Sequence, residues 1–287
     1  MIPAFKYRKP AELKEVLEHL GQDGAMVVAG GTDLVIALKK RSANPQVLID
    51  ITGVEALKCI RLDKNIVHIG PATSFTAVAN SALLRKRANV LAEAAQVVGS
   101  PQIRNRGTIG GNIANGSPAA DTVPALVALE ASITLQSRNG KRTMPVTELL
   151  DGLGKGLPAN GEMITDIMFS LPAETARSCF VKLGRRNALA ISRLSMALIV
   201  SLPADGRIGQ AAMALGAVAP HPVRVPEAEA LLLGQLPAAD IFDQTAAGVS
   251  RFVQKTLGNR ASAPYKERAV CGVAKEALAK LFPGIYC

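Results

Sequence analysis

The 287 residues are 48% hydrophobic and 20% charged, which excludes a disordered chain and leaves room for more than one domain. Aromatic residues make up only 3%, without Trp, which argues against a surface that stacks the bases of single-stranded nucleic acid. The net charge of +10 suits an anionic ligand or an acidic partner, but the basic residues are spread along the chain rather than gathered into a nucleic-acid footprint.

The first fifty residues predict alternating helices and strands. Apolar residues at helical spacing indicate a helix over residues 11–20. Apolar runs at 25–29 and 47–51 predict two buried strands. Between these strands Gly30-Gly31 predicts a turn, and Thr32 is the expected cap of the helix that follows.

The middle of the chain predicts hairpins, helices and one long loop. Residues 100–121 are rich in Gly, Asn, Ser and Pro, and long loops of this kind inside compact domains are usually functional. We expect hairpins at residues 59–70 and 133–144, a helix at 83–98, a short helix from Thr122 and a strand at 163–171.

The last part of the chain predicts one sheet and several helices. Residues 172–175 are the expected linker. Strands are expected at 180–183, 195–202 and 209–217, and the remainder is expected to be mainly helical, with a break at 235–237.

Two glycine pairs are candidates for binding an anion. Gly30-Gly31 and Gly110-Gly111 each follow an apolar run and precede a small polar residue. Glycine permits positive φ and leaves backbone N–H groups bare, so two such turns could hold both phosphates of a dinucleotide. Each pair alone is equally consistent with a turn that needs glycine for its geometry.

Asp121 also has two interpretations, as an acceptor for a ribose hydroxyl or as the N-cap of the next helix.

Other common site chemistries are not represented. Neither glycine pair fits G-x-G-x-x-G, and the three histidines adjoin no nucleophile elbow. The four cysteines are too scattered to ligate zinc or an iron–sulfur cluster. No signal peptide or apolar run of membrane-spanning length is evident, so we expect a cytoplasmic protein whose chemistry comes from a cofactor.

Four segments together resemble a known family. They are Val27-Val28-Ala29-Gly30-Gly31-Thr32-Asp33, Gln102-Ile103-Arg104-Asn105, Gly107-Thr108-Ile109-Gly110-Gly111-Asn112 and Ser117-Pro118-Ala119-Ala120-Asp121. In this order and spacing they closely resemble the FAD-binding medium subunit of molybdenum hydroxylases, the family that includes the flavin subunits of xanthine dehydrogenase and aerobic carbon monoxide dehydrogenase. The resemblance runs over nearly the whole chain, including Lys182 and Arg185-Arg186.

The resemblance implies an α+β fold in two domains. A two-lobed FAD-binding domain of the vanillyl-alcohol-oxidase type would occupy residues 1–174, with its first lobe over residues 1–57 and its second over 58–174. A smaller α+β domain with a short antiparallel sheet and helices would follow over 175–287. FAD would lie between the lobes and the C-terminal domain.

The family's cofactor contacts fall on matching residues of this chain. Asp121 would accept a hydrogen bond from a ribose hydroxyl, and Lys182 would stabilise negative charge on the reduced flavin. Ile103 and Leu157 would contact the rings. The resemblance assigns no catalytic or metal-binding residue. The diphosphate would be held from one side by Val27, Val28, Ala29, Gly30, Gly31, Thr32, Asp33 and Leu34, and from the other by Thr108, Gly110, Gly111, Asn112 and Asn115.

Two departures from the family pattern bear on the site. Many relatives carry an Asp shortly after the Arg pair, where this chain has Asn187-Ala188-Leu189-Ala190-Ile191-Ser192, and the effect near the flavin is left open. One branch of the family carries an inserted loop whose cysteines bind an extra iron–sulfur cluster. The scattered cysteines here imply that this cluster is absent.

By this resemblance the chain is the FAD-carrying electron-transfer subunit of a heterotrimeric oxidoreductase. Substrate would be hydroxylated on a large molybdopterin-binding subunit. Electrons would pass through [2Fe–2S] clusters of a small subunit to FAD, and then to NAD or another acceptor. Two alternatives stay open: a self-contained flavin reductase of the same superfamily, and a scaffold that has lost FAD.

Overall fold

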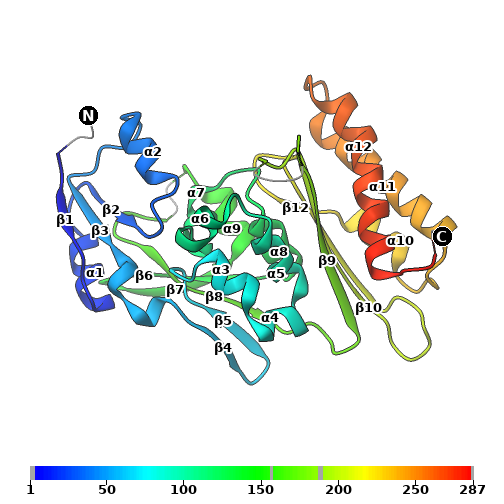
Figure 1. Ribbon diagram of the computed structural model, residues 1–287, viewed down its shortest axis with the longest axis horizontal. Helices are drawn as coiled ribbons and strands as arrows, with labels where there is room; N and C mark the ends of the chain where they lie inside the picture. Colours follow the sequence, from blue (N-terminus) through cyan, green and yellow to red (C-terminus); the bar gives the residue numbers. More distant parts are fainter. Residues whose placement is uncertain (1–3, 156–157, 187–189, 286–287) are drawn as a thin grey trace. The chain divides into compact units, whose positions relative to one another are not determined.

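A computed structural model describes residues 4–155, 158–186 and 190–285. The chain forms two units that alternate along the sequence (Figure 1). The first unit runs to Val78 and also takes Pro101–Gly116 and Glu130–Ser170, and the second takes Ala79–Ser100, Ser117–Leu129 and the chain from Leu171 onward. These two units are divided differently from the two domains predicted from the sequence, 1–174 and 175–287. Those domain bounds stay a prediction.

A three-stranded parallel sheet lies at the N-terminal end of the first unit. Its order is β1-β3-β2, from β1 (Lys6–Arg8), β3 (Val47–Asp50) and β2 (Ala25–Val28). Helix α1 (Leu13–Leu20) packs on β2 and β3 through its buried apolar face, and the predicted helix and strands are confirmed. The connections are α2 (Leu34–Lys39) and two short 3-10 helices, η1 (Ile51–Gly53) and η2 (Glu55–Leu57).

A five-stranded antiparallel sheet completes the first unit. Its order is β4-β5-β8-β6-β7. Both predicted hairpins are present, as β4 (Ile60–Asp63) with β5 (Ile66–Ile69), and β6 (Ser132–Ser137) with β7 (Gly140–Pro145). The other elements here are α9 (Val146–Gly152) and β8 (Met163–Ser170), and α3 (Phe75–Asn80) leads out of the unit.

The second unit is built on a four-stranded antiparallel sheet with helices on both faces. Its order is β12-β11-β10-β9, from β12 (Val223–Arg224), β11 (Gln210–Gly216), β10 (Leu194–Ser201) and β9 (Ala176–Leu183). All eight residues of β10 are buried. The helices are α4 (Ala82–Arg87), α5 (Asn89–Gln96), α8 (Thr122–Ala128), α10 (Pro226–Leu232), α11 (Ala239–Leu257) and α12 (Ala263–Leu281).

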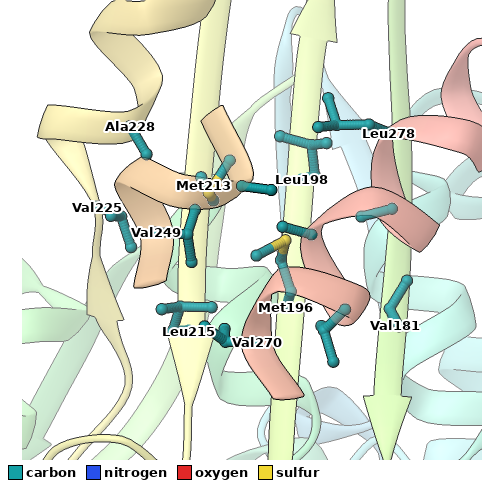
Figure 2. Packing of buried hydrophobic residues seen from close by; sticks show 14 of the residues in the cluster. Val181, Met196, Leu198, Met213, Leu215, Val225, Ala228, Val249, Val270 and Leu278 are labelled. Carbon is teal, nitrogen blue, oxygen red and sulfur yellow. The ribbon is translucent and has the colours of Figure 1, made fainter. Parts of the chain in front are cut away.

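The core of the second unit explains why β10 is mostly apolar. Figure 2 shows Met196 and Leu198 of β10 in one apolar cluster with residues of the C-terminal helices, among them Val249 and Val270. Helices α5 and α8 also pack against the sheet, on β9, β10 and β11. A central strand covered on both faces offers few positions for a polar side chain, and β10 has only the small Ser195 and Ser201.

Two predicted elements differ in the structure. The helix expected at 83–98 is divided into α4 and α5, because Ala88 leaves helical geometry with φ −144° and ψ 52°. The loop expected at 100–121 contains two short helices, α6 (Pro101–Arg106) and α7 (Ile109–Asn115). Within the described residues no helix combines the length and apolar character needed to cross a membrane.

Candidate functional site: two glycine turns and a buried carboxylate

The first glycine turn leaves the carboxyl end of β2 and enters α2. Gly31 has φ +73°, a conformation that favours glycine. Thr32 does not cap the helix as predicted. Asp33 occupies the N-cap position without a side-chain bond to the helix, and the Thr32 hydroxyl donates to Asp33 Oδ2 at 3.3 Å. No described residue accepts a hydrogen bond from the backbone N–H groups of residues 30–33. The turn therefore presents a row of free donors.

The second glycine turn is the N-terminus of α7, and its amides are already used. Thr108 is the N-cap, with Oγ1 accepting from Gly111 N at 3.2 Å. The N–H groups of Ile109 and Gly110 donate to carbonyl oxygens of Thr73 and Pro71, and Asn112 N donates to Thr108 O. The expectation of bare amides at both turns is therefore wrong for this turn. The exposed side chain of Asn115 and the half-buried side chain of Asn112 also lie on this helix.

The two members of each glycine pair have different surroundings. A Cβ atom on Gly30 would overlap the carbonyl group of Arg106, and one on Gly110 would overlap Pro71. Gly111 is exposed, and the nearest atom to a Cβ there would be Thr108 Oγ1 at 3.0 Å. The contact of Gly30 with Arg106 brings the first turn beside the segment that leads into the second, within one unit. Close backbone packing explains Gly30 and Gly110, whereas Gly111 faces outward.

Two residues of the first unit, Ile103 and Leu157, are expected to contact a ring of FAD, and only Ile103 is described by the structure. Ile103 lies on α6 with 37% of its surface exposed, so its side chain is available to an apolar ligand group. Leu157 lies outside the described residues, as do residues 187–189 of the departure at 187–192. The last residue of that departure, Ser192, is described below.

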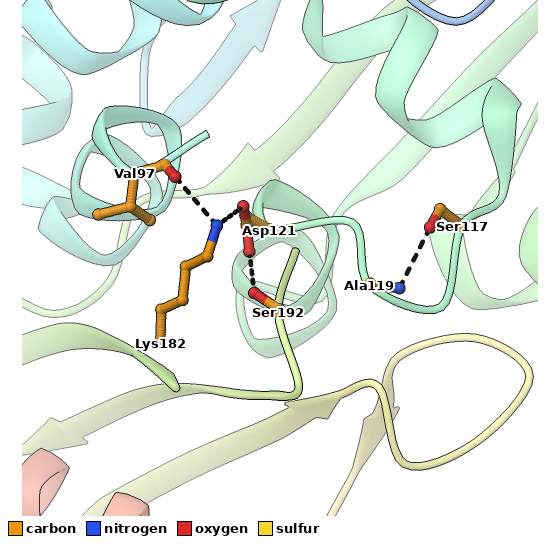
Figure 3. A network of polar contacts seen from close by, with 6 residues as sticks. All are labelled: Val97, Ser117, Ala119, Asp121, Lys182 and Ser192. Atoms are coloured by element: carbon orange, nitrogen blue, oxygen red, sulfur yellow. Dashed lines mark hydrogen bonds and ion pairs between the residues drawn. The ribbon is translucent and has the colours of Figure 1, made fainter. Parts of the chain in front are cut away.

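Asp121 and Lys182 lie in the second unit and pair with each other (Figure 3). Lys182 Nζ donates to Asp121 Oδ2 at 2.6 Å and to the carbonyl oxygen of Val97 at 3.0 Å. Ser192 Oγ donates to Asp121 Oδ1 at 2.5 Å. Asp121 stands at the N-cap position of α8 but makes no capping bond, so the capping interpretation of this side chain is wrong.

Burial governs the electrostatics of this cluster. Side-chain exposure is 12% for Lys182 and 7% for Asp121. Removal of the Asp121 carboxylate from water raises its pKa, while the Lys182 ammonium and the Ser192 hydroxyl oppose that rise by stabilising the charged form. Asp121 is thus a buried acceptor whose charge depends on its partners.

Two serines near this cluster were missed by the sequence reasoning. Ser192 precedes β10 and bonds Asp121, and nothing in the sequence beyond a small polar residue indicated this role. Ser195 pairs in register with Lys182 of β9 and with Gly216 of β11. Its hydroxyl is fully buried and has no hydrogen-bond partner among the described residues.

Comparison with known proteins gives the family. Residues 3–173 match the model of the FAD binding domain in molybdopterin dehydrogenase, and residues 179–281 match the CO dehydrogenase flavoprotein C-terminal domain. The nicotinate dehydrogenase FAD-subunit of Eubacterium barkeri is 36% identical over 279 residues, covering 95% of this chain and 94% of that protein. The carbon monoxide dehydrogenase medium chain of Hydrogenophaga pseudoflava is 31% identical, with 96% of each chain covered.

Solved structures agree with these relatives. A carbon monoxide dehydrogenase from Hydrogenophaga pseudoflava, which lacks the Mo-pyranopterin moiety of its molybdenum cofactor, superposes with a TM-score of 0.89 at 31% identity over 98% of both chains. Quinoline 2-oxidoreductase from Pseudomonas putida 86 gives a TM-score of 0.89 at 25% identity over 100% of both chains. The chain belongs to the FAD-binding medium subunits of the molybdenum hydroxylase family, and is therefore an oxidoreductase subunit with an α+β fold.

Proposed function

We propose that this chain carries FAD as the electron-transfer subunit of a multi-subunit molybdenum hydroxylase. The observation that supports the site is the row of free N–H groups at residues 30–33, held beside the segment that leads to Thr108. Consecutive free amides in a glycine-containing turn form a concave donor surface that suits a diphosphate. FAD, when bound, would supply the exchange of electrons between a one-electron and a two-electron partner.

The proposed contacts can be assigned separately to the diphosphate, to a ribose hydroxyl and to the rings of FAD. We assign the diphosphate to the amides of residues 30–33 and to the side chains of Asn112 and Asn115. The exposed Gly111 keeps that surface free of a side chain. The neighbouring residues Val27, Val28, Ala29, Leu34, Thr108 and Gly110 shape the backbone around these donors.

Other residues are assigned to the hydroxyl groups, the rings and the negative charge of FAD. Asp121, as a buried carboxylate, would accept from a ribose hydroxyl. Ile103 would cover an aromatic ring, and the same contact is proposed for Leu157. Lys182 would contribute positive charge, either to the flavin directly or through the Asp121 carboxylate that it contacts.

The proposed partners follow from the names of the relatives. Those names describe medium chains and FAD subunits, which belong to larger assemblies. We propose a large molybdopterin-binding subunit and a small [2Fe–2S] subunit as partners, with NAD or another acceptor taking the electrons. We also propose a cytoplasmic location, where free thiols such as those of Cys59, Cys179 and Cys271 stay reduced.

The test is FAD retention in a pair of matched glycine variants. Gly111→Val places a branched side chain on the exposed surface of α7, and we expect it to lose most of its FAD. Gly272→Val is the control, because Gly272 is an exposed position on α12 with no atom within 4 Å of a Cβ. Flavin absorbance and chromatography of the cofactor released by heat measure the FAD content, and circular dichroism checks the fold.

Each result selects one interpretation. Full FAD content in Gly111→Val would reject the glycine-turn site. A wild-type chain that neither carries nor takes up FAD would favour the scaffold alternative. Co-purification of a large and a small subunit with the chain would support the electron-transfer role over a self-contained flavin reductase.

A further inference from the structure

The segment that carries Asp121 is tied to the end of the C-terminal sheet at three points. Ala217, at the end of β11, donates from its backbone N–H to the carbonyl oxygen of Pro118 at 2.7 Å. Lys182 of β9 and Ser192 before β10 each bond one oxygen of the Asp121 carboxylate (Figure 3). Residues in or next to three strands of one sheet therefore hold this segment and its carboxylate in place.

The Lys182 ammonium is itself held in a fixed position. It donates to the carbonyl oxygen of Val97 at 3.0 Å as well as to Asp121. A lysine whose head group meets both a carbonyl and a carboxylate, with only 12% of the side chain exposed, has lost most of its freedom to point elsewhere. Its positive charge is therefore directed at Asp121.

The carboxylate keeps the capacity to accept further hydrogen bonds. Each Asp121 oxygen has a single partner among the described residues, whereas an ionised carboxylate can accept about four hydrogen bonds. The burial that raises the pKa of Asp121 would favour the neutral acid, a weaker acceptor, if Lys182 were removed.

We propose that Lys182 is a positioning residue for Asp121, which it orients and keeps ionised so that the carboxylate can accept a hydroxyl of FAD. This inference rests on the proposed function. It means that the contribution of Lys182 to FAD affinity passes through Asp121 rather than through a direct contact with the flavin. Ser192 has the same role to a smaller degree, because its hydroxyl is neutral.

The test is a double-variant cycle on the full chain, with FAD as the titrated ligand. Lys182→Met and Asp121→Asn should each weaken FAD binding by about tenfold to a hundredfold, the range for one hydrogen bond to a charged group. The double variant should bind no more weakly than the weaker of the two single variants, since both changes remove one interaction. Multiplied effects in the double variant would overturn the inference and show that Lys182 acts on FAD directly.

A pH series separates positioning from a purely structural role. In Lys182→Met the affinity for FAD should fall at a higher pH than in the wild-type chain, because the carboxyl then takes up a proton more readily. Asp121→Asn should remove that titration. A lower melting temperature with unchanged affinity and pH profile would show that the ion pair serves stability alone.

Two serine variants keep the test decisive if Lys182→Met does not fold. Ser192→Ala removes one donor to Asp121 and should weaken FAD binding less than Lys182→Met does. Ser195→Ala is the matched control, because that buried hydroxyl bonds no described residue, and its affinity should be unchanged. Equal affinities of the two serine variants would overturn the inference. A wild-type chain that binds no FAD would instead overturn the proposed function, and the inference with it.

Discussion

At the scale of single residues, adjacent glycines serve different purposes. Gly30 allows two backbone segments to touch, because any side chain there would overlap the carbonyl group of Arg106. Gly31 takes φ +73°, so a substitution at that position is strained by its backbone conformation. Gly111 is helical and exposed, and a Cβ there would approach only the Thr108 hydroxyl, at 3.0 Å. A valine at position 111 therefore tests ligand binding at the cost of a small shift of the Thr108 side chain, whereas one at position 31 would strain the backbone itself.

Gly30→Ala should reduce stability even without a ligand. The new Cβ atom would force the turn away from Arg106, and overpacking of this kind costs about 1–3 kcal/mol. Urea unfolding of the apo chain measures the change. Gly272→Ala is the control and should stabilise by about 0.5–1 kcal/mol, since alanine is the better helix former at an open, exposed position. An unfolding free energy of Gly30→Ala equal to that of the wild type would contradict the close packing.

At the scale of elements, a fork of hydrogen bonds joins β7 to the start of β8. Arg142 donates to Glu162 from Nε at 2.8 Å and from Nη2 at 2.7 Å, and Ala159 N donates to the same carboxylate at 2.8 Å. Hydrogen bonds from Arg142 lower the pKa of Glu162 below its ordinary value of 4.5. Because the folded-state pKa is lowered, the pair stabilises the fold above pH 4.5 and loses this contribution as the pH falls through the lowered value.

Glu162→Gln should therefore destabilise the chain at neutral pH, and progressively less in acid. The side chain of Arg142 is 45% exposed, so solvent screening limits the expected loss to about 1 kcal/mol or less. Urea unfolding at stepwise lower pH measures the difference. The control is Glu55→Gln, whose carboxylate is 83% exposed in its pair with Lys58 and should matter little. A constant difference between wild type and Glu162→Gln at every pH would rule out the linkage.

The elements that could be predicted from the sequence are those specified locally. The strand that ends at Val28 and the hairpin around residues 63–65 follow from apolar runs and turn residues. The break at Ala88 could not be predicted, because alanine favours helix and the amide of Val90 is satisfied by the distant Ser178 hydroxyl. Helix α7 likewise depends on carbonyl groups of Pro71 and Thr73, which hold a glycine-rich sequence in helical form.

The candidate site shows the same limit. Its glycine pairs, Asp121 and Lys182 were identified from sequence, because motif spacing and the family resemblance mark them. The pairing of Asp121 with Lys182 and Ser192 was not, because it joins residues from three separate elements through side-chain geometry. The loss of free amides at α7 was also hidden, since their acceptors lie some forty residues earlier in the chain.

At the scale of the whole molecule, each unit is drawn from separated pieces of the chain. The C-terminal sheet depends on α5, where Glu93 accepts from Phe180 N at 2.7 Å, and on α8, all of whose residues are buried. A fragment of residues 175–287 lacks both helices. We expect it not to unfold cooperatively, as judged by circular dichroism during heating, whereas the full chain should. A sharp two-state transition of the fragment would show that the C-terminal segment folds alone.

The alternation of the two units also affects synthesis and inheritance. The apolar helices α5 and α8 are made well before the strands β9, β10 and β11 that cover them, so a nascent chain must keep those surfaces from aggregating until translation is nearly complete. For the same reason, the C-terminal segment cannot be exchanged between relatives as a free module. A productive recombination would have to carry matching versions of α5 and α8, and we therefore expect these helices and the sheet to be inherited together.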